Sequence, residues 1–340
     1  MRLGDRVIDP PVLLAPMAGL TDRPFRALVA RFGAGLVVSE MLASRELLAR
    51  SPSALARAEV AAGAAPSSVG TAVQIAGWDP QAMAEAARRL VGDGAHVIDI
   101  NMGCPAKKVA KRAAGAGLMR EPALALAVVE AVVGAAHGSG GVPVTLKMRL
   151  GWNAGALNAP WIAARAEAAG VRRVTVHGRT RCQFYAGRAD WAAIRRVVEA
   201  VRVPVVADGD IVDAATARRA LAASGAAGVM IGRAAVGRPW ALAEIAAGLA
   251  GRPAPGRPRG AAYAALVAEH VEAALSFYGV PVGIRAVRKH LDGYLAQVVG
   301  GAALRARLIR EDDPRRLLAG IAEMGVLDGF DAGAPLARAA

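Results

Sequence analysis

The chain has 340 residues, of which 54% are hydrophobic and only two are cysteines, so it can bury a large core but cannot form a disulfide framework. Its 42 basic residues outnumber its 28 acidic ones, and the net charge of +14 favours a polyanionic partner such as nucleic acid. The sequence contains no zinc-ligand spacing, no unbroken apolar span of membrane length and no apolar signal core near its first residues. We therefore expect a cytoplasmic protein without a metal or membrane contact, and no protein partner is implied.

One pattern repeats along the first three quarters of the chain: a short β-branched run, a turn and an alanine-rich helical stretch. The runs are apolar throughout rather than alternating, as expected for strands buried on both faces of a parallel sheet. They lie at residues 12–15, 36–39, 72–75, 97–100, 144–148, 174–177, 203–207 and 229–231. Eight such units predict a closed (β/α)₈ TIM barrel. An open doubly wound sheet is the alternative, but no strand is followed by a G-x-G-x-x-G turn.

Residues 251–260 are rich in proline and glycine, and they can form neither a helix nor a central strand. Beyond this linker, residues 263–278, 284–298 and 314–324 show helical spacing without further strand-like runs. The sequence therefore predicts two domains, a catalytic barrel over residues 1–248 and a linker with a small helical domain over residues 249–340.

Cys104 lies in the sequence DINMGCP, directly after the fourth predicted strand. A free cysteine is more often an inert core residue, but barrel enzymes build their active sites at the carboxyl ends of the strands. A thiol is mostly protonated at neutral pH, so it can act as a general acid. Cys104 is therefore a candidate catalytic residue, whereas Cys182 is expected to be silent.

Other polar residues and glycines also follow the predicted strands, and a barrel would gather them at one mouth. In chain order they are Pro16, Met17, Ala18, Ser39, Glu40, Met41, Gln74, Asn101, Lys147, Arg149, His177, Arg179, Asp208, Gly209, Asp210, Gly232 and Arg233. This site would contain an amide, a thiol, an amine, an imidazole and two glycine turns.

Gly209 and Gly232 follow the seventh and eighth strands, where barrels commonly bind phosphate through backbone N–H groups, and Arg233 adds positive charge. The stretch 228–240 is therefore predicted to anchor a phosphorylated cofactor, and the absence of a Rossmann turn favours a mononucleotide such as FMN. Lys147 would stabilise the negative charge of reduced flavin, and Gln74 would hydrogen-bond to its uracil-like edge.

These motifs resemble the tRNA-dihydrouridine synthase family, most closely its bacterial B type. The resemblance runs through residues 15–26, 74–77, 99–108, 147–149, 177–180 and 232–235, and past the linker into 285–290. It covers nearly the whole chain, and NMGCP at residues 101–105 is highly specific. The resemblance implies an FMN-binding barrel with a helical tRNA-binding domain, which reduces a D-loop uridine of tRNA with NADPH. One departure is Asp208, because the family's seventh strand usually ends in asparagine-glycine and a carboxylate cannot donate as an amide does.

The family also implies roles for individual residues. Cys104 would give a proton to C5 of uracil while hydride reaches C6 from the flavin. The cofactor would be bound by Pro16, Met17, Ala18, Gln74, Lys147, His177, Asp208, Gly209, Asp210, Gly232 and Arg233. The RNA substrate would be bound by Asn101, Arg149, Arg179, Arg181, Arg285, Arg288 and Lys289.

Two other functions remain open on the sequence. A flavin barrel dehydrogenase acting on a free pyrimidine, resembling the dihydroorotate and dihydropyrimidine enzymes, would share the fold and a cysteine acid but would not need a basic helical domain. An RNA-binding protein without catalysis would explain the charge but leave Cys104, Lys147 and the glycine turns without a purpose.

Overall fold

The computed structural model of the chain describes residues 1–58, 70–110 and 113–326. The strands are β1 (Arg2–Leu3), β2 (Arg6–Val7), β3 (Val12–Leu14), β4 (Leu36–Val38), β5 (Leu42–Ala43), β6 (Gly70–Ala76), β7 (Val97–Met102), β8 (Val144–Arg149), β9 (Arg173–His177), β10 (Val205–Asp208) and β11 (Gly228–Ile231). The helices of the barrel region are α1 (Arg23–Phe32), α2 (Ser44–Leu48), α3 (Pro52–Ala58), α4 (Pro80–Gly92), α5 (Lys107–Ala110), η1 (Gly115–Arg120), α6 (Pro122–Gly138), α7 (Ala159–Ala168), α8 (Trp191–Ala200), α9 (Ala214–Ser224), η2 (Arg233–Ala235) and α10 (Ala241–Leu249). They are followed by α11 (Gly260–Tyr278), α12 (Val280–Ala296), α13 (Ala302–Leu308), α14 (Pro314–Ala322) and η3 (Glu323–Gly325).

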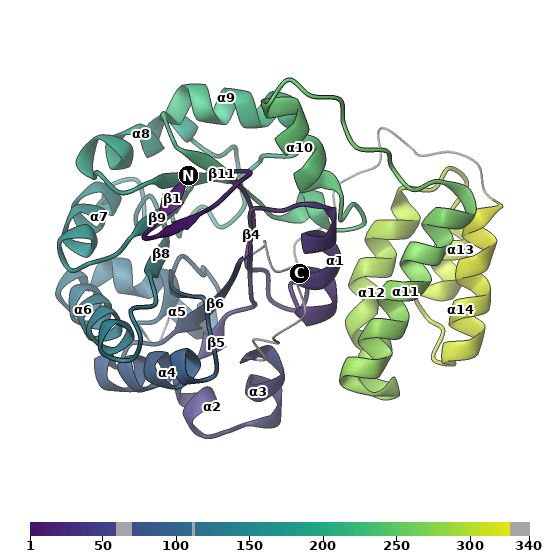
Figure 1. The fold of residues 1–340 in the computed structure, drawn as a ribbon, viewed down its shortest axis with the longest axis horizontal. Coiled ribbons are helices and arrows are strands. Elements are labelled where there is room, and N and C mark those ends of the chain that lie inside the picture. The colour runs from purple at the N-terminus through teal and green to yellow at the C-terminus, as the bar shows by residue number, and fades with distance from the viewer. Residues whose placement is uncertain (59–69, 111–112, 327–340) are drawn as a thin grey trace.

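Eight parallel strands close into a barrel in the order β4-β3-β11-β10-β9-β8-β7-β6, and β6 pairs back with β4. Helices surround the strands (Figure 1). This confirms the predicted TIM barrel, and each of the eight predicted runs coincides with one of its strands. The short strand β5, which pairs with β6 outside this ring, was not predicted, because two residues carry no detectable period.

Successive strand residues face opposite sides of the barrel wall. Leu13 and Met230 point into the barrel, where they pack with Leu3 and Ile8 from the hairpin β1–β2 and the loop after it. Leu14 instead belongs to the larger core between strands and helices. Both faces of each strand are thus buried, which explains why the strand sequences are apolar without alternation.

Aspartate residues define where several helices begin. Asp22 precedes α1, and its carboxylate accepts a hydrogen bond of 3.0 Å from the Phe25 N–H. Asp190 and Asp213 cap α8 and α9 in the same way. Each carboxylate satisfies an N–H group that has no partner within the helix.

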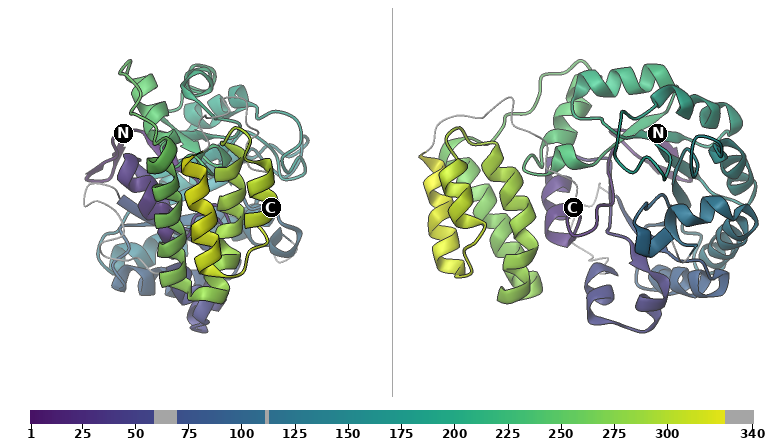
Figure 2. Two further views of the ribbon diagram at one scale, coloured as in Figure 1. Left: turned by 90° about the vertical axis from the view of Figure 1, so that its right-hand side faces the viewer. Right: turned by 180° about the vertical axis from the view of Figure 1, so that it is seen from behind.

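Helices α11–α14 form a bundle beside the barrel, next to α1 and α10, and Figure 2 shows the same arrangement from two further sides. The bundle has its own core, which includes Tyr263, Tyr294 and Leu317 and also takes in Trp240 from the barrel side. Helix α13 was not predicted, and α11 begins at Gly260, the last residue of the predicted linker. In the part of the chain that the structure describes, no helix is both long and apolar enough to cross a bilayer.

Candidate active site

A cavity of about 560 Å³ opens at the carboxyl ends of the barrel strands, within the usual size range of small-molecule sites. Among the predicted residues, those that line it are Pro16, Met17, Ala18, Met41, Gln74, Asn101, Cys104, Lys147, Arg149, His177, Asp208, Gly209, Asp210, Gly232 and Arg233. The barrel thus brings together every residue predicted to bind the cofactor.

The loop after β7 presents Cys104 to this cavity. The Asn101 side-chain oxygen accepts hydrogen bonds from the backbone N–H groups of Gly103, at 3.1 Å, and of Cys104, at 3.0 Å. Cys104 is half-buried, and its backbone is therefore held from the end of a strand. The predicted role of Asn101 is substrate binding, but its amide here also fixes the position of the thiol.

A buried network of polar side chains on the neighbouring strands holds the Asn101 side chain in position. Its amide nitrogen donates to Gln74 Oε1 at 2.7 Å, and Gln74 Nε2 donates to Asp99 Oδ2 at 2.7 Å. Asp99 also accepts from the Thr145 hydroxyl and lies 3.7 Å from the Arg173 guanidinium, which is fully buried. Sequence analysis missed Asp99 and Arg173 as supporting residues, although a charged residue inside an apolar strand is a usable signal.

Lys147 forms an ion pair with Asp208 across the cavity floor, and both side chains are largely buried. Burial raises the pKa of the Asp208 carboxyl, but the charge and hydrogen bond of Lys147, together with His177 and Arg149, outweigh it, so the pKa lies below its usual value. Asp208 therefore stays ionised, and its charge is neutralised by the same lysine that was predicted to face the flavin.

His177 lies beside this pair. Burial lowers the pKa of its imidazole to about 3, so the ring is neutral at physiological pH. Its Nδ1 atom is buried and has no hydrogen-bond partner among the described residues.

Arg179 does not line the cavity. Its guanidinium is 2% exposed and donates to both carboxylate oxygens of Asp210, at 3.0 and 2.7 Å, and to the carbonyls of Ala186 and Gly187. It therefore holds Asp210, whose φ of +55° is unusual for a residue with a side chain. Arg233 lies 3.9 Å from the same carboxylate and lines the cavity.

The turns after β10 and β11 leave backbone donors open. Within the described residues, the N–H groups of Gly209, Asp210, Gly232 and Arg233 make no hydrogen bond. Gly209 has a φ of +108°, and a Cβ there would lie 2.9 Å from the Ala189 Cβ, so glycine is required. Two sets of free N–H groups with Arg233 between them can bind a phosphate.

Arg149 joins two loops at the cavity rim. Its Nε donates to the Gly103 carbonyl at 2.9 Å, and its Nη1 donates to the carbonyls of Thr180 and Phe184 at 2.9 and 2.8 Å. Arg181, by contrast, stacks on the rings of Trp152 and Phe184, each 4.8 Å away, and does not line the cavity.

The three basic residues of α12 differ in their surroundings. Lys289 reaches the loop that follows β3, where its Nζ is 3.0 Å from the position a Cβ would take at Gly19. Arg285 is exposed, and Arg288 pairs with Asp312 at 2.5 Å.

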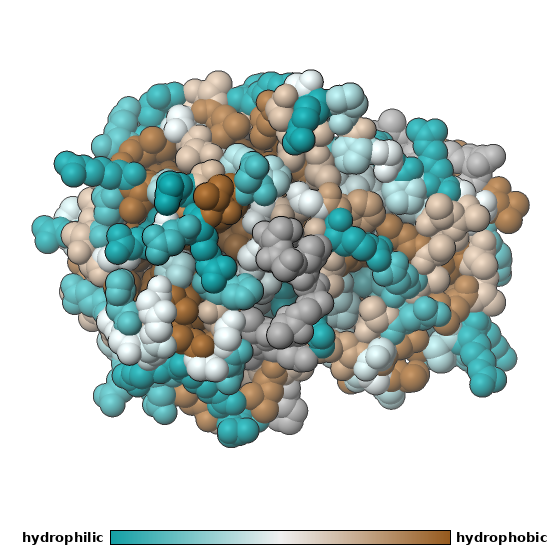
Figure 3. All heavy atoms as spheres, in the orientation of Figure 1, coloured by the Kyte–Doolittle hydropathy of each residue, from teal (hydrophilic) through white to brown (hydrophobic). Residues whose placement is uncertain are grey.

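On the face shown in Figure 3, hydrophilic side chains are interspersed with small apolar groups over both the barrel and the bundle.

A comparison with solved structures finds the same fold in histamine dehydrogenase from Rhizobium sp. 4-9, with a TM-score of 0.56 and 12% identity over 80% of this chain and 50% of that one. Among curated proteins, a probable tRNA-dihydrouridine synthase of Rhodobacter capsulatus is 59% identical, over 92% of this chain and 94% of its own length. The tRNA-dihydrouridine synthase B of Pseudomonas syringae pv. tomato is 44% identical, over 95% of this chain and 94% of its own. The profile of the family described as dihydrouridine synthase (Dus) matches residues 13–323. On these grounds the chain belongs to the dihydrouridine synthase family.

Proposed function

We propose that this enzyme is a tRNA-dihydrouridine synthase that reduces the C5–C6 double bond of a D-loop uridine, with FMN as its cofactor and NADPH as the reductant. The observation that carries the proposal is the position of Cys104, which faces the same cavity as the Lys147–Asp208 pair and the two glycine turns. Family membership and the names of the relatives support the same reaction.

The cavity fits a flavin mononucleotide. The free N–H groups at Gly209 and Gly232, with Arg233, would bind its phosphate, and the His177 side chain lines the same cavity. Lys147 would lie near the ring system, where a positive charge stabilises the reduced state. When bound, FMN supplies the hydride that C6 of uracil accepts.

Asp208 replaces the asparagine that is usual in the family, and its ion pair explains how a carboxylate is accommodated. The two side chains together carry no net charge, so Asp208 offsets the positive charge that Lys147 would bring to the cofactor site beside an asparagine. The pair also restricts the lysine side chain to one place in the cavity.

The proton for C5 would come from the Cys104 thiol, whose position is fixed through Asn101. Negative charge that develops on the uracil O4 would be stabilised by Arg149, whose Nη2 makes no hydrogen bond in the described structure. Since the cavity lies inside the barrel mouth, the uridine must leave its stack in the RNA before it reaches Cys104. Arg285, Arg288 and Lys289 would hold the RNA around it.

The test is to purify the protein and record its absorbance spectrum, and then to measure NADPH oxidation with unmodified tRNA or with free uridine. We expect bound FMN, turnover with tRNA and negligible turnover with the nucleoside. Lys147→Ala should lose flavin, whereas Lys107→Ala, at an exposed lysine of α5, should retain it. A wild-type protein that takes up no FMN, or that reduces free uridine as fast as tRNA, would contradict the proposal.

A further inference from the structure

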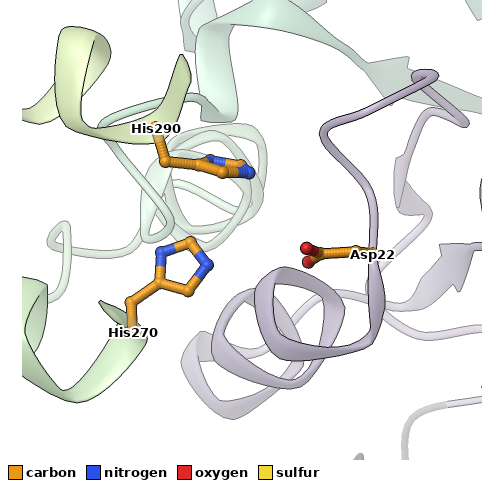
Figure 4. Close-up of side chains that lie close together, drawn as sticks. All are labelled: Asp22, His270 and His290. Atoms are coloured by element: carbon orange, nitrogen blue, oxygen red, sulfur yellow. The ribbon is translucent and has the colours of Figure 1, made fainter. Parts of the chain in front are cut away.

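A second cluster of chemically reactive side chains lies away from the cavity, between the barrel and the helical bundle. It consists of Asp22, the residue before α1, His270 on α11 and His290 on α12, and one ligand atom from each lies within 4.8 Å of the others. Figure 4 shows the His270 ring directed toward the Asp22 carboxylate, with the His290 ring beside it. All three side chains are at least nine-tenths buried, at 6%, 3% and 1% exposure.

The hydrogen bonds around the two histidines leave one nitrogen free on each ring. His290 Nε2 lies 3.0 Å from the Leu20 carbonyl, which can only accept, so Nε2 carries the hydrogen and Nδ1 presents a lone pair. His270 Nδ1 lies 2.9 Å from the Tyr294 hydroxyl, and Nε2 is the free atom. Both His290 Nδ1 and His270 Nε2 are buried without a partner in the described part of the chain.

A buried polar atom without a partner destabilises the folded state, so two of them beside a carboxylate indicate that something else binds there. We propose that Asp22, His270 and His290 form a zinc site that joins the helical bundle to the barrel. Two imidazoles and one carboxylate are a common protein ligand set for zinc, with water as the fourth ligand.

The outer contacts match those of metal sites, where each ligand is oriented by a second hydrogen bond. The Leu20 carbonyl orients His290, the Tyr294 hydroxyl orients His270, and the Phe25 N–H and the Tyr278 hydroxyl bind Asp22.

Ligand atoms of a tetrahedral zinc site lie about 3.3 Å apart, so the cation would draw the three groups closer together. The ligands come from α11, α12 and the loop between β3 and α1, and that loop also lines the catalytic cavity. Zinc would therefore fix the bundle to the wall of the active site. The sequence offered no sign of this, because the histidines are far from Asp22 along the chain.

The test uses the full-length protein without an affinity tag, incubated with ZnCl2 and freed of excess metal by gel filtration. We expect about one zinc per chain by mass spectrometry of the metal, and a rise in Tm of at least about 2 °C. Asp22→Asn is the informative variant, because asparagine caps a helix as well as aspartate does but lacks the charge. It should bind zinc at least about 10-fold more weakly, and His270→Gln should do the same.

The matched control is His137→Gln, which changes an exposed histidine on α6 and should leave zinc binding unchanged. A measurement that needs no variant is titration with CoCl2, which should give the absorption bands of four-coordinate cobalt at wavelengths beyond those of the flavin. The proposal is overturned if the wild type retains no zinc, if Asp22→Asn binds zinc as tightly, or if cobalt gives no such bands.

Discussion

In the proposed reaction Cys104 donates the proton to C5, and this role can be tested separately from cofactor binding. Cys104→Ala should keep FMN and its reduction by NADPH, because the residues predicted to bind the cofactor lie on strands and loops other than β7 and the loop after it. Turnover of tRNA uridine should fall by about 100-fold or more, the usual loss when a general acid is removed. Single-turnover mixing of the reduced enzyme with unmodified tRNA measures this step.

The control for that experiment is Cys182→Ala, at the exposed cysteine. It should behave like the wild type. Full activity in Cys104→Ala would assign the proton to another group.

His177 predicts a pH dependence of stability. Its folded pKa of about 3 lies below the value of about 6.5 expected in the unfolded chain. The contribution of His177 to the free energy of unfolding is therefore complete above pH 6.5. It is lost as the pH falls toward 3, since only the unfolded chain takes up the proton in that range. Between pH 7 and pH 5 the wild type should lose up to about 2 kcal/mol more unfolding free energy than His177→Gln.

Urea unfolding at the two pH values measures this difference, and His137→Gln serves as the exposed control. The same pH dependence in the wild type and His177→Gln would show that the imidazole is not kept neutral by burial.

At the scale of elements, helix α12 carries the predicted RNA contacts. Arg285 and Lys289 are exposed and lie one turn apart, with Arg288 on the same side. Replacing all three by alanine should weaken tRNA binding and flatten its dependence on salt, because each lost phosphate contact lowers the slope by about 0.7 to 0.9. Fluorescence anisotropy with labelled tRNA at several salt concentrations measures both.

A variant with the same charge change tests whether position matters. Arg310, which follows α13, and Arg315 and Arg316, in the first turn of α14, are also exposed. Replacing these three by alanine should leave most of the salt dependence of tRNA binding unchanged. If both triple variants bind tRNA with the same affinity and salt dependence, the RNA surface lies elsewhere. The alternative is the basic stretch that begins at Lys107 and Lys108. Its other two members, Lys111 and Arg112, fall outside the described residues.

At the scale of the whole molecule, Trp240 connects the barrel to the bundle. It is 1% exposed, and its ring lies 6.0 Å from Phe32 on α1 and 5.8 Å from Tyr263 on α11. Trp240→Ala should lower the free energy of unfolding by about 3–5 kcal/mol, because it leaves a cavity where the two parts meet.

Urea unfolding followed by circular dichroism checks this value. Trp161→Ala removes an indole that is 46% exposed and should change stability by about 0.5 kcal/mol or less. Equal losses in the two variants would mean that Trp240 does not join the two cores.

The barrel could be predicted from the sequence because its signals are local. Each strand is a short apolar run, and each run is followed by a turn and an alanine-rich helical stretch. The position of Cys104 could be predicted for the same reason, since it directly follows β7 and a barrel brings all such ends together. The place of the candidate active site in the fold was therefore determined by the order of elements along the chain.

The pairing of side chains was decided only by the tertiary structure. Arg179 was predicted to bind RNA but donates to Asp210, and Lys147 shares its charge with Asp208. The His290 ring hydrogen-bonds to the Leu20 carbonyl, although the two residues are 270 positions apart in the sequence. Such partners lie on different strands and helices, so no local period relates them. Their distances depend on how the barrel closes and where the bundle packs against it.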